Sequence, residues 1–94
     1  FPAWIAYEFP SPQTINSYRI YTGGNRHPYD FTFDGWNGTT WNVLDTQTHY
    51  VMDDYTSYQF FLSSPATYNK FRLFVTSAQD IGNYVWVVEL ELLS

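Results

Sequence analysis

Hydrophobic and polar residues alternate along most of the chain, in short runs that end at proline, glycine, asparagine or serine. Because the side chains of a β-strand point to its two faces in turn, this period of two predicts strands with one buried face. No stretch repeats apolar residues at helical spacing, and we expect no helix longer than one turn. The pattern predicts seven strands, at residues 4–9, 14–21, 31–36, 41–45, 57–62, 70–76 and 85–93.

The third predicted strand leads into a predicted hairpin. Along this strand Phe33 is expected to face inward and Asp34 outward. Asn37-Gly38 predicts a tight turn, since asparagine and glycine tolerate the positive φ angles that hairpin turns require. Trp36 and Trp41 flank the turn, and we interpret them as a cross-strand aromatic pair rather than as a platform for a sugar.

The second predicted strand contains an irregularity. Ile15 and Tyr18 are both suited to the core but differ in parity, which predicts a β-bulge between them. Together the strands predict an all-β jelly-roll sandwich of about seven antiparallel strands. An eight-stranded jelly roll needs one strand more, so we expect at least one N-terminal strand to be missing. The edge left open would be covered by another chain or by a neighbouring copy.

Composition narrows the class of protein. The 94 residues suit a single domain, residues 1–94. With 45% hydrophobic, 22% aromatic and 14% charged residues, the chain is unlike disordered, collagen-like or coiled-coil proteins. The net charge of −5 includes only four lysines and arginines, which argues against nucleic acid and anionic membranes as partners. Cysteine is absent, and no apolar run is long enough for membrane insertion.

The lengths of the connections indicate where binding takes place. If consecutive strands run in alternating directions, the long connections 22–30, 46–56 and 77–84 meet at one end of the sandwich. The shorter connections, at residues 10–13, 37–40 and 63–69, meet at the other end. Long loops on a rigid scaffold commonly carry binding residues. The long loops combine planar polar groups with aromatic rings, which suits the hydroxyl groups and the C–H face of a sugar.

Six short motifs, in order along the chain, resemble the discoidin domain, also called the coagulation-factor type C domain. They are Trp4-Ile5-x-Tyr7-x-Phe9, Tyr18-Arg19-Ile20, Pro28-x-x-Phe31-x-Phe33-x-Gly35, Trp41-x-x-Leu44-Asp45, Phe71-Arg72-Leu73 and Glu89-Leu90-Glu91-Leu92. The family includes bacterial carbohydrate-binding modules with a galactose-binding-like jelly roll. The resemblance implies one discoidin-like domain over residues 1–94. That domain would be N-terminally incomplete, because members carry a segment before the Trp-Ile-x-Tyr strand.

The resemblance also implies site residues. The family's sugar-binding loops correspond to residues 22–30 and 77–84, and the matching candidates are Asn25, Arg26, His27 and Tyr84. Arg26 would act as a hydrogen-bonding fork and Tyr84 as a stacking ring. Asn25-Arg26-His27-Pro28 departs from the pattern of galactose binders, so galactose specificity is not implied. For two of these residues a structural alternative stays open. His27 could be an ordinary exposed loop histidine, and Tyr84 could pack on the last strand.

A structural calcium ion is a further implication of the resemblance. The family's calcium site draws on the Glu-Leu-Glu-Leu strand, which points to Glu89 and to the carbonyl of Val88. Calcium takes six to eight oxygen ligands, and the chain supplies only these two from the matching motif. The alternative is that Glu89 and Glu91 pair with Arg19 or Arg72.

Catalytic motifs are absent from the sequence. It has no cysteine nucleophile, no G-x-S-x-G, no H-E-x-x-H and no phosphate-binding loop. Asp53 and Asp54 are neighbours in one loop, whereas a glycosidase pair faces across a cleft of about 5–9 Å. We therefore expect a protein that is not an enzyme.

Two functions fit the sequence. The first is a non-catalytic carbohydrate-binding or cell-adhesion module that binds glycans or glycoproteins, on a cell or virion surface or otherwise outside the cell. The alternative is a structural jelly-roll subunit of an extracellular filament, capsid, tail fibre or surface layer, assembled by strand pairing between chains.

Overall fold

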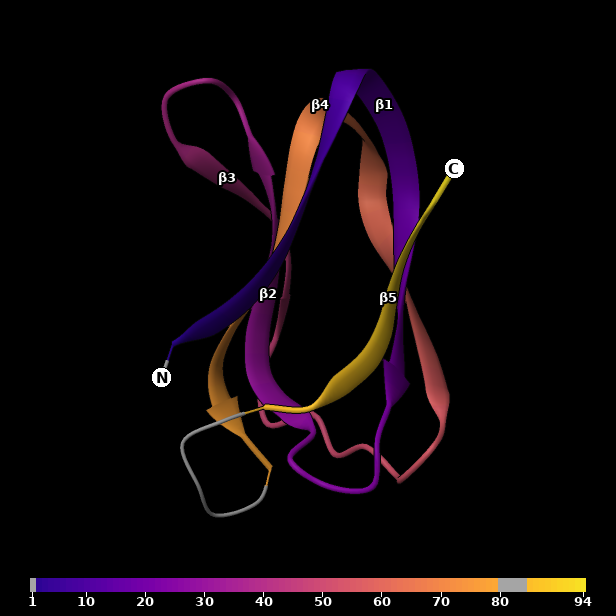
Figure 1. The fold of residues 1–94 in the computed structure, drawn as a ribbon. Coiled ribbons are helices and arrows are strands. Elements are labelled where there is room, and N and C mark those ends of the chain that lie inside the picture. The colour runs from indigo at the N-terminus through magenta and orange to yellow at the C-terminus, as the bar shows by residue number, and fades with distance from the viewer. Residues whose placement is uncertain (1, 80–84) are drawn as a thin grey trace.

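The computed structural model describes residues 2–79 and 85–94, and these residues form one antiparallel β-sheet (Figure 1). The order of the strands across the sheet is β3-β2-β4-β1-β5. Within the described part of the chain, no helix is long and apolar enough to span a membrane. The prediction of an all-β chain is confirmed. The five strands are β1 (Ala3–Thr22), β2 (Pro28–Trp36), β3 (Trp41–Gln47), β4 (Ser57–Ala78) and β5 (Val87–Leu93).

Two long strands fold the sheet into two layers. β1 and β4 pair along both of their halves, with Ala3 opposite Val75 near one end and Tyr21 opposite Ser57 near the other. Both strands bend over at the top of Figure 1, between the two paired regions. One layer, which lies on the left in Figure 1 and which we name the front layer, contains β3, β2, the second half of β4 and the first half of β1. The other layer, which lies on the right and which we name the back layer, contains the first half of β4, the second half of β1, and β5.

All seven predicted strands are present, but two pairs of them are continuous. Residues 4–9 and 14–21 both belong to β1, and residues 57–62 and 70–76 both belong to β4. The prolines that predicted strand ends, Pro10, Pro12 and Pro65, lie at the bends, where the pairing of β1 with β4 is interrupted. Proline has no amide hydrogen for a ladder, so it is accommodated there without ending the strand. The last strand begins at Val87, two residues later than predicted.

The predicted irregularity between Ile15 and Tyr18 of β1 is present, but the extra residues lie in the partner strand, β4. Ile15 pairs with Ala66 and Ser17 with Phe61, so residues 62–65 of β4 lie opposite Asn16 alone. This shift in register places both Ile15 and Tyr18 in the core, at 5% and 0% exposure, despite their different parity.

Aromatic rings fill the space between the layers. The ring of Tyr18 stacks on Phe33 at 4.3 Å and on Phe60 at 5.1 Å between centroids. Its hydroxyl donates a 2.5 Å hydrogen bond to Asp45 on β3, in the other layer. Burial, reinforced by this bond, raises the pKa of Tyr18. The other fully or nearly buried apolar residues are Ile15, Ile20, Phe31, Met52, Phe71, Leu73, Val75 and Leu90.

The prediction that Asp34 faces solvent is wrong, since the residue is 1% exposed. Asp34 does point away from Phe33, toward the outer face of the front layer, but other side chains cover it there. Arg72 Nε donates a 2.7 Å hydrogen bond to its carboxylate. The Arg72 guanidinium lies 4.3 Å from the ring centroids of both Trp41 and Phe74. This cation–π stack buries an ion pair where the sequence pattern predicted an exposed carboxylate.

The predicted hairpin turn is confirmed at residues 37–40. Asn37 N–H donates to the Thr40 carbonyl at 3.1 Å, and the Asn37 side chain accepts from the amides of Thr39 and Thr40. Gly38 has a φ of 98°, which favours glycine. Trp36 and Trp41 pair across the strands with ring centroids 5.2 Å apart, as predicted.

Candidate functional site

The loops between strands gather at one end of the sandwich, at the bottom of Figure 1. We call this end the loop pole; it comprises residues 23–27, 48–56, 79, 85 and 86 of the described chain. The opposite end, with the turn 37–40 and the bends of β1 and β4, is the hairpin pole. The connections between β1 and β2 and between β3 and β4 lie at the loop pole and the turn 37–40 at the hairpin pole, as the alternation of strand directions predicted. Residues 80–84 of the third long connection lie outside the described residues.

Backbone hydrogen bonds tie the three loops together. Tyr55 N–H donates to the Gly23 carbonyl at 3.0 Å, which joins the second loop to the first. Trp86 N–H donates to the Arg26 carbonyl at 2.9 Å, which joins the third loop to the first. These bonds restrict the conformations that the described parts of the three loops can adopt.

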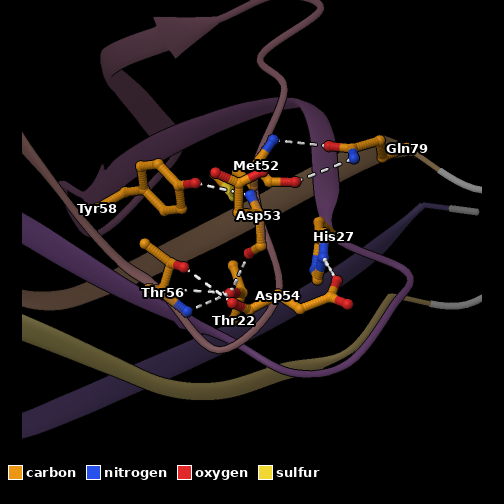
Figure 2. A network of polar contacts seen from close by, with 8 residues as sticks. All are labelled: Thr22, His27, Met52, Asp53, Asp54, Thr56, Tyr58 and Gln79. Carbon is orange, nitrogen blue, oxygen red and sulfur yellow. Dashed lines mark hydrogen bonds and ion pairs between the residues drawn. The ribbon is translucent and has the colours of Figure 1, made fainter.

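Side chains add a partly buried network of hydrogen bonds beneath these loops (Figure 2). Gln79 holds the second loop at Met52, accepting from its amide at 2.7 Å and donating to its carbonyl at 3.0 Å. Thr22 donates to the Asp53 carbonyl at 2.6 Å, and its hydroxyl accepts from the Thr56 amide at 2.9 Å. The backbone polar groups of the second loop thus find partners inside the protein.

His27 lies within this network rather than on the surface. Its side chain is 2% exposed, and Nε2 lies 2.7 Å from Asp54 Oδ1 in the second loop (Figure 2). The carbonyl of His27 accepts a 2.8 Å hydrogen bond from the amide of Gln79. The residue therefore links all three loops. Its predicted contact with a ligand stays a prediction, and its burial favours a bracing role.

Three non-glycine residues of the described chain have left-handed backbone conformations, and all three lie at the loop pole. Arg26, His49 and Tyr55 have φ angles of 57°, 52° and 49°. Such conformations are unfavourable for residues with a Cβ atom, so contacts around these loops must hold their backbone in place.

Two exposed aromatic rings lie against a glycine pair at this pole. A Cβ atom on Gly23 would come within 2.6 Å of the Trp86 ring, and one on Gly24 within 2.8 Å of the Tyr55 hydroxyl. Trp86 is 43% exposed and Tyr55 is 63% exposed. At Gly23 a side chain would displace the Trp86 ring, whereas at Gly24 only the far end of the Tyr55 side chain would have to move. Exposed, well-supported rings of this kind suit stacking on the apolar face of a sugar.

A second aromatic pair lies nearby. The rings of Tyr29 and His49 stack with centroids 5.0 Å apart. Asp30 supports the pair, since its carboxylate accepts hydrogen bonds from the Ser77 hydroxyl at 2.5 Å and the His49 amide at 2.8 Å. These two bonds, that from Ser77 above all, lower the pKa of the Asp30 carboxyl.

The described site candidates lie together at the loop pole. Asn25 is exposed and Arg26 half-buried, next to the glycine pair. Tyr84 lies outside the described residues. The sequence did not single out Trp86, which it assigned to the last strand, or Tyr55 as a stacking ring. Gly23 and Gly24 were the signal in the sequence that could have indicated these ring contacts, since glycine often marks a place where other groups come close to the backbone.

The predicted calcium site involves β5. Glu89 lies opposite Tyr21 on the exposed part of β5, and Val88 is 50% exposed. In the described part of the chain, no three acidic or histidine side chains come close enough to hold a metal ion. Glu91 pairs with Arg19 at 3.1 Å, one of the alternatives left open by the sequence. Glu89 and the Val88 carbonyl do not form a calcium site by themselves, and calcium binding stays a prediction.

Comparison with known proteins identifies the fold. No family model matches the sequence, and no curated protein matches it. Solved structures do match.

Chitosan-binding module 1 from a chitosanase/glucanase of Paenibacillus sp. IK-5, as its V110M mutant, superposes with a TM-score of 0.82 at 20% identity. CpGH89CBM32-5 of Clostridium perfringens, in complex with GalNAc-β-1,3-galactose, gives 0.83 at 12% identity. The family 32 carbohydrate-binding module of C. perfringens NanJ, in complex with galactose, gives 0.80 at 13% identity.

These matches cover 100%, 100% and 98% of this chain and 69%, 67% and 66% of the respective structures. The chain thus spans about two thirds of the length of these structures. It has the galactose-binding-like jelly-roll fold of the family 32 carbohydrate-binding modules, as the resemblance implied.

Proposed function

We propose that this chain is a non-catalytic carbohydrate-binding module, placed outside a cell or on a cell or virion surface, that binds glycans or glycoproteins at the loop pole. The observation that carries the proposal is the pair of exposed rings, Tyr55 and Trp86, packed against Gly23 and Gly24. The fold supports it, because the similar structures include a chitosan-binding module and modules in complex with galactose and with GalNAc-β-1,3-galactose.

In this proposal the residues have distinct roles. Trp86 and Tyr55 stack on the C–H face of a sugar ring, and Asn25 and Arg26 exchange hydrogen bonds with its hydroxyl groups. His27, together with Asp54, keeps the first and second loops in register from below. Tyr84, whose place lies outside the described residues, stays a candidate for a further stacking contact. A single shallow site binds weakly, so the affinity of a larger protein would come from repeated modules.

A glycan array followed by calorimetry tests the proposal. Trp86→Ala removes a stacking face and should weaken binding of the best array ligand about tenfold. The separate variant Arg26→Ala should also weaken binding of this ligand, because it removes a bidentate hydrogen-bond donor. Phe61→Ala is the matched control, since this ring is 71% exposed but lies on β4 near the bulge, away from the loops. Binding that survives both loop variants unchanged would remove the site from the loop pole.

One observation favours a second candidate, assembly by strand pairing. The first half of β1 pairs with β4 on one side only, and no described strand pairs with its other side. An apolar cavity of about 220 Å³ adjoins this edge, and its lining includes Trp4, Ile5, Leu73, Val75, Val85 and Val87. An open strand edge beside an apolar cavity can accept a strand from another chain. Sedimentation velocity decides: a mass that rises with concentration supports assembly, and a constant monomer mass excludes it.

A further inference from the structure

The hairpin pole carries a groove that the proposed site does not include. It has a volume of about 480 Å³ and lies between the start of β3 with its hairpin turn and the bend of β4. Its polar lining consists of Asn37, Asn42, Ser63, Ser64, Thr67 and Tyr68, and the remaining lining residues are apolar. None of the residues that line it is charged. In Figure 1 this pole lies at the top, away from the loops.

The groove follows from two features of the sheet. β3 pairs with β2, and within the described residues no strand pairs with its outer edge. On the facing wall, residues 62–65 of β4 form the bulge opposite Asn16, so Ser63 and Ser64 stand out from the regular pairing of β4 with β1. Ser63 and Ser64 therefore line the groove from outside the regular ladder, opposite the unpaired edge of β3.

A directed chain of hydrogen bonds orients the polar groups of the other wall. Asn37 Nδ2 donates to Asn42 Oδ1 at 3.3 Å, and Asn42 Nδ2 donates to the Tyr68 hydroxyl at 3.0 Å. Within the described contacts the Tyr68 oxygen only accepts, so its O–H is available as a donor toward the groove. The Tyr68 ring is fixed, because it lies against Gly35, where a Cβ atom would be 2.4 Å away.

A second groove, of about 400 Å³, continues beyond Tyr68. It shares Asn37, Thr67 and Tyr68 with the first and adds Trp36 and Asn69. Together the two grooves form a tract across the pole with Tyr68 at its centre. The tract is longer than either groove alone. It offers aromatic rings together with uncharged hydrogen-bond donors and acceptors.

We propose that this tract is a second binding site, and that its ligand is a neutral oligosaccharide. Amide and hydroxyl groups both donate and accept, as sugar hydroxyls do, and the rings and apolar side chains suit sugar C–H faces. A charged glycan would find no counter-charge among the lining residues of either groove. The site is distinct from the loop pole, and a chain 36 Å in its longest dimension can bind two glycans at once.

An NMR titration of the ¹⁵N-labelled chain tests this site. The probes are neutral hexasaccharides of glucose, xylose and mannose, with hexagalacturonate as the charged comparison. At least one neutral probe should shift the side-chain amide signal of Asn42 and the backbone signals of Ser63 and Ser64, and hexagalacturonate should not. These shifts should persist in Trp86→Ala, which weakens the loop pole. They are therefore separable from signals at Gly23 and Asn25, which report on the proposed function.

Tyr68→Phe removes only the hydroxyl and keeps the ring against Gly35. It should weaken the neutral probe about fivefold at this site, as expected for the loss of one hydrogen bond to a ligand. Tyr21→Phe is the control, since Tyr21 is an exposed tyrosine of β1 near the loop pole. This variant should bind the neutral probe at the hairpin pole with the affinity of the parent chain. No shift at the hairpin pole with any neutral probe, equal shifts with hexagalacturonate, or an unchanged affinity in Tyr68→Phe would overturn the proposal.

Discussion

The Asp30 carboxylate illustrates how a single side chain supports the loop pole. It accepts hydrogen bonds from Ser77 and from the amide of His49, and these bonds lower its pKa below the ordinary 3.8. A folded-state pKa below the unfolded value means that the unfolded chain binds more protons in acid. The contribution of Asp30 to stability is therefore present above the unfolded pKa and lost as the pH falls through the folded pKa.

Asp30→Asn should accordingly lower the melting temperature at neutral pH, and the difference from the parent chain should shrink as the pH falls below 3.8. Thermal unfolding followed by circular dichroism across this range measures the effect. Asp53→Asn makes the same change in the second loop, where no described hydrogen bond reaches the carboxylate. A difference that is constant with pH for Asp30→Asn would contradict the assignment.

Removing one partner of the ion pair between Arg72 and Asp34 should have a larger effect on the free energy of unfolding. The Asp34 side chain is 2% exposed and that of Arg72 17%. Arg72→Met leaves a buried carboxylate without its partner, and we expect a loss of about 3–5 kcal/mol. Urea unfolding at neutral pH measures the loss. Arg72→Met with Asp34→Leu removes both charges and should recover much of it; a double variant no more stable than the single one would show that packing of the guanidinium on the rings dominates.

Residue-level predictions from the sequence held where local chemistry decides the outcome. The Asn37-Gly38 turn and the Trp36–Trp41 pair depend on neighbouring residues, and both are present. The exposure of Asp34 was wrong, because its burial depends on side chains from β3 and β4 that are distant in the sequence. Trp86 was overlooked for the same reason, since its contact with Gly23 is visible only in the folded chain.

At the scale of elements, the period of two located every strand, but the proline signals divided two strands that are continuous. Prolines indicate where regular pairing stops, and they do so correctly at Pro10, Pro12 and Pro65. Whether the chain then leaves the sheet or bends within it depends on the partner strand. β1 and β4 bend together, so each one keeps its neighbour on both sides of the corner. The residues next to each proline therefore do not show whether the strand ends there or bends and continues.

The loops at the loop pole show a similar division. Their position at one end was predicted because consecutive strands alternate in direction, so every second connection lies at the same end of the sandwich. Which side chains face outward depends on how the loops pack against one another, as at His27, which is buried against Asp54. The described candidates taken from the resemblance, Asn25, Arg26 and His27, thus share a location. The proposed stacking role falls instead to Tyr55 and Trp86, whose rings meet the glycine pair only in the folded chain.

At the scale of the whole molecule, the two layers are parts of one sheet. β1 and β4 each run through both layers, and the hydroxyl groups of Tyr7 and Tyr18 cross between them to reach Leu90 and Asp45. The two layers also share one core, in which the Tyr18 ring stacks on Phe33 of the other layer. We therefore expect the chain to unfold as a single cooperative unit.

Urea unfolding should give coincident transitions by tryptophan fluorescence, which includes Trp36 and Trp41 of the front layer, and by far-ultraviolet circular dichroism, which reports on all strands. Hydrogen exchange is the sharper measurement, because it resolves individual amides. Arg72→Met perturbs the front layer only, yet it should lower the protection of the Ile20 amide in the back layer by the same free energy that it removes from the global stability. If Ile20 kept its protection, the layers would open separately, and the bends of β1 and β4 would act as hinges between independent units.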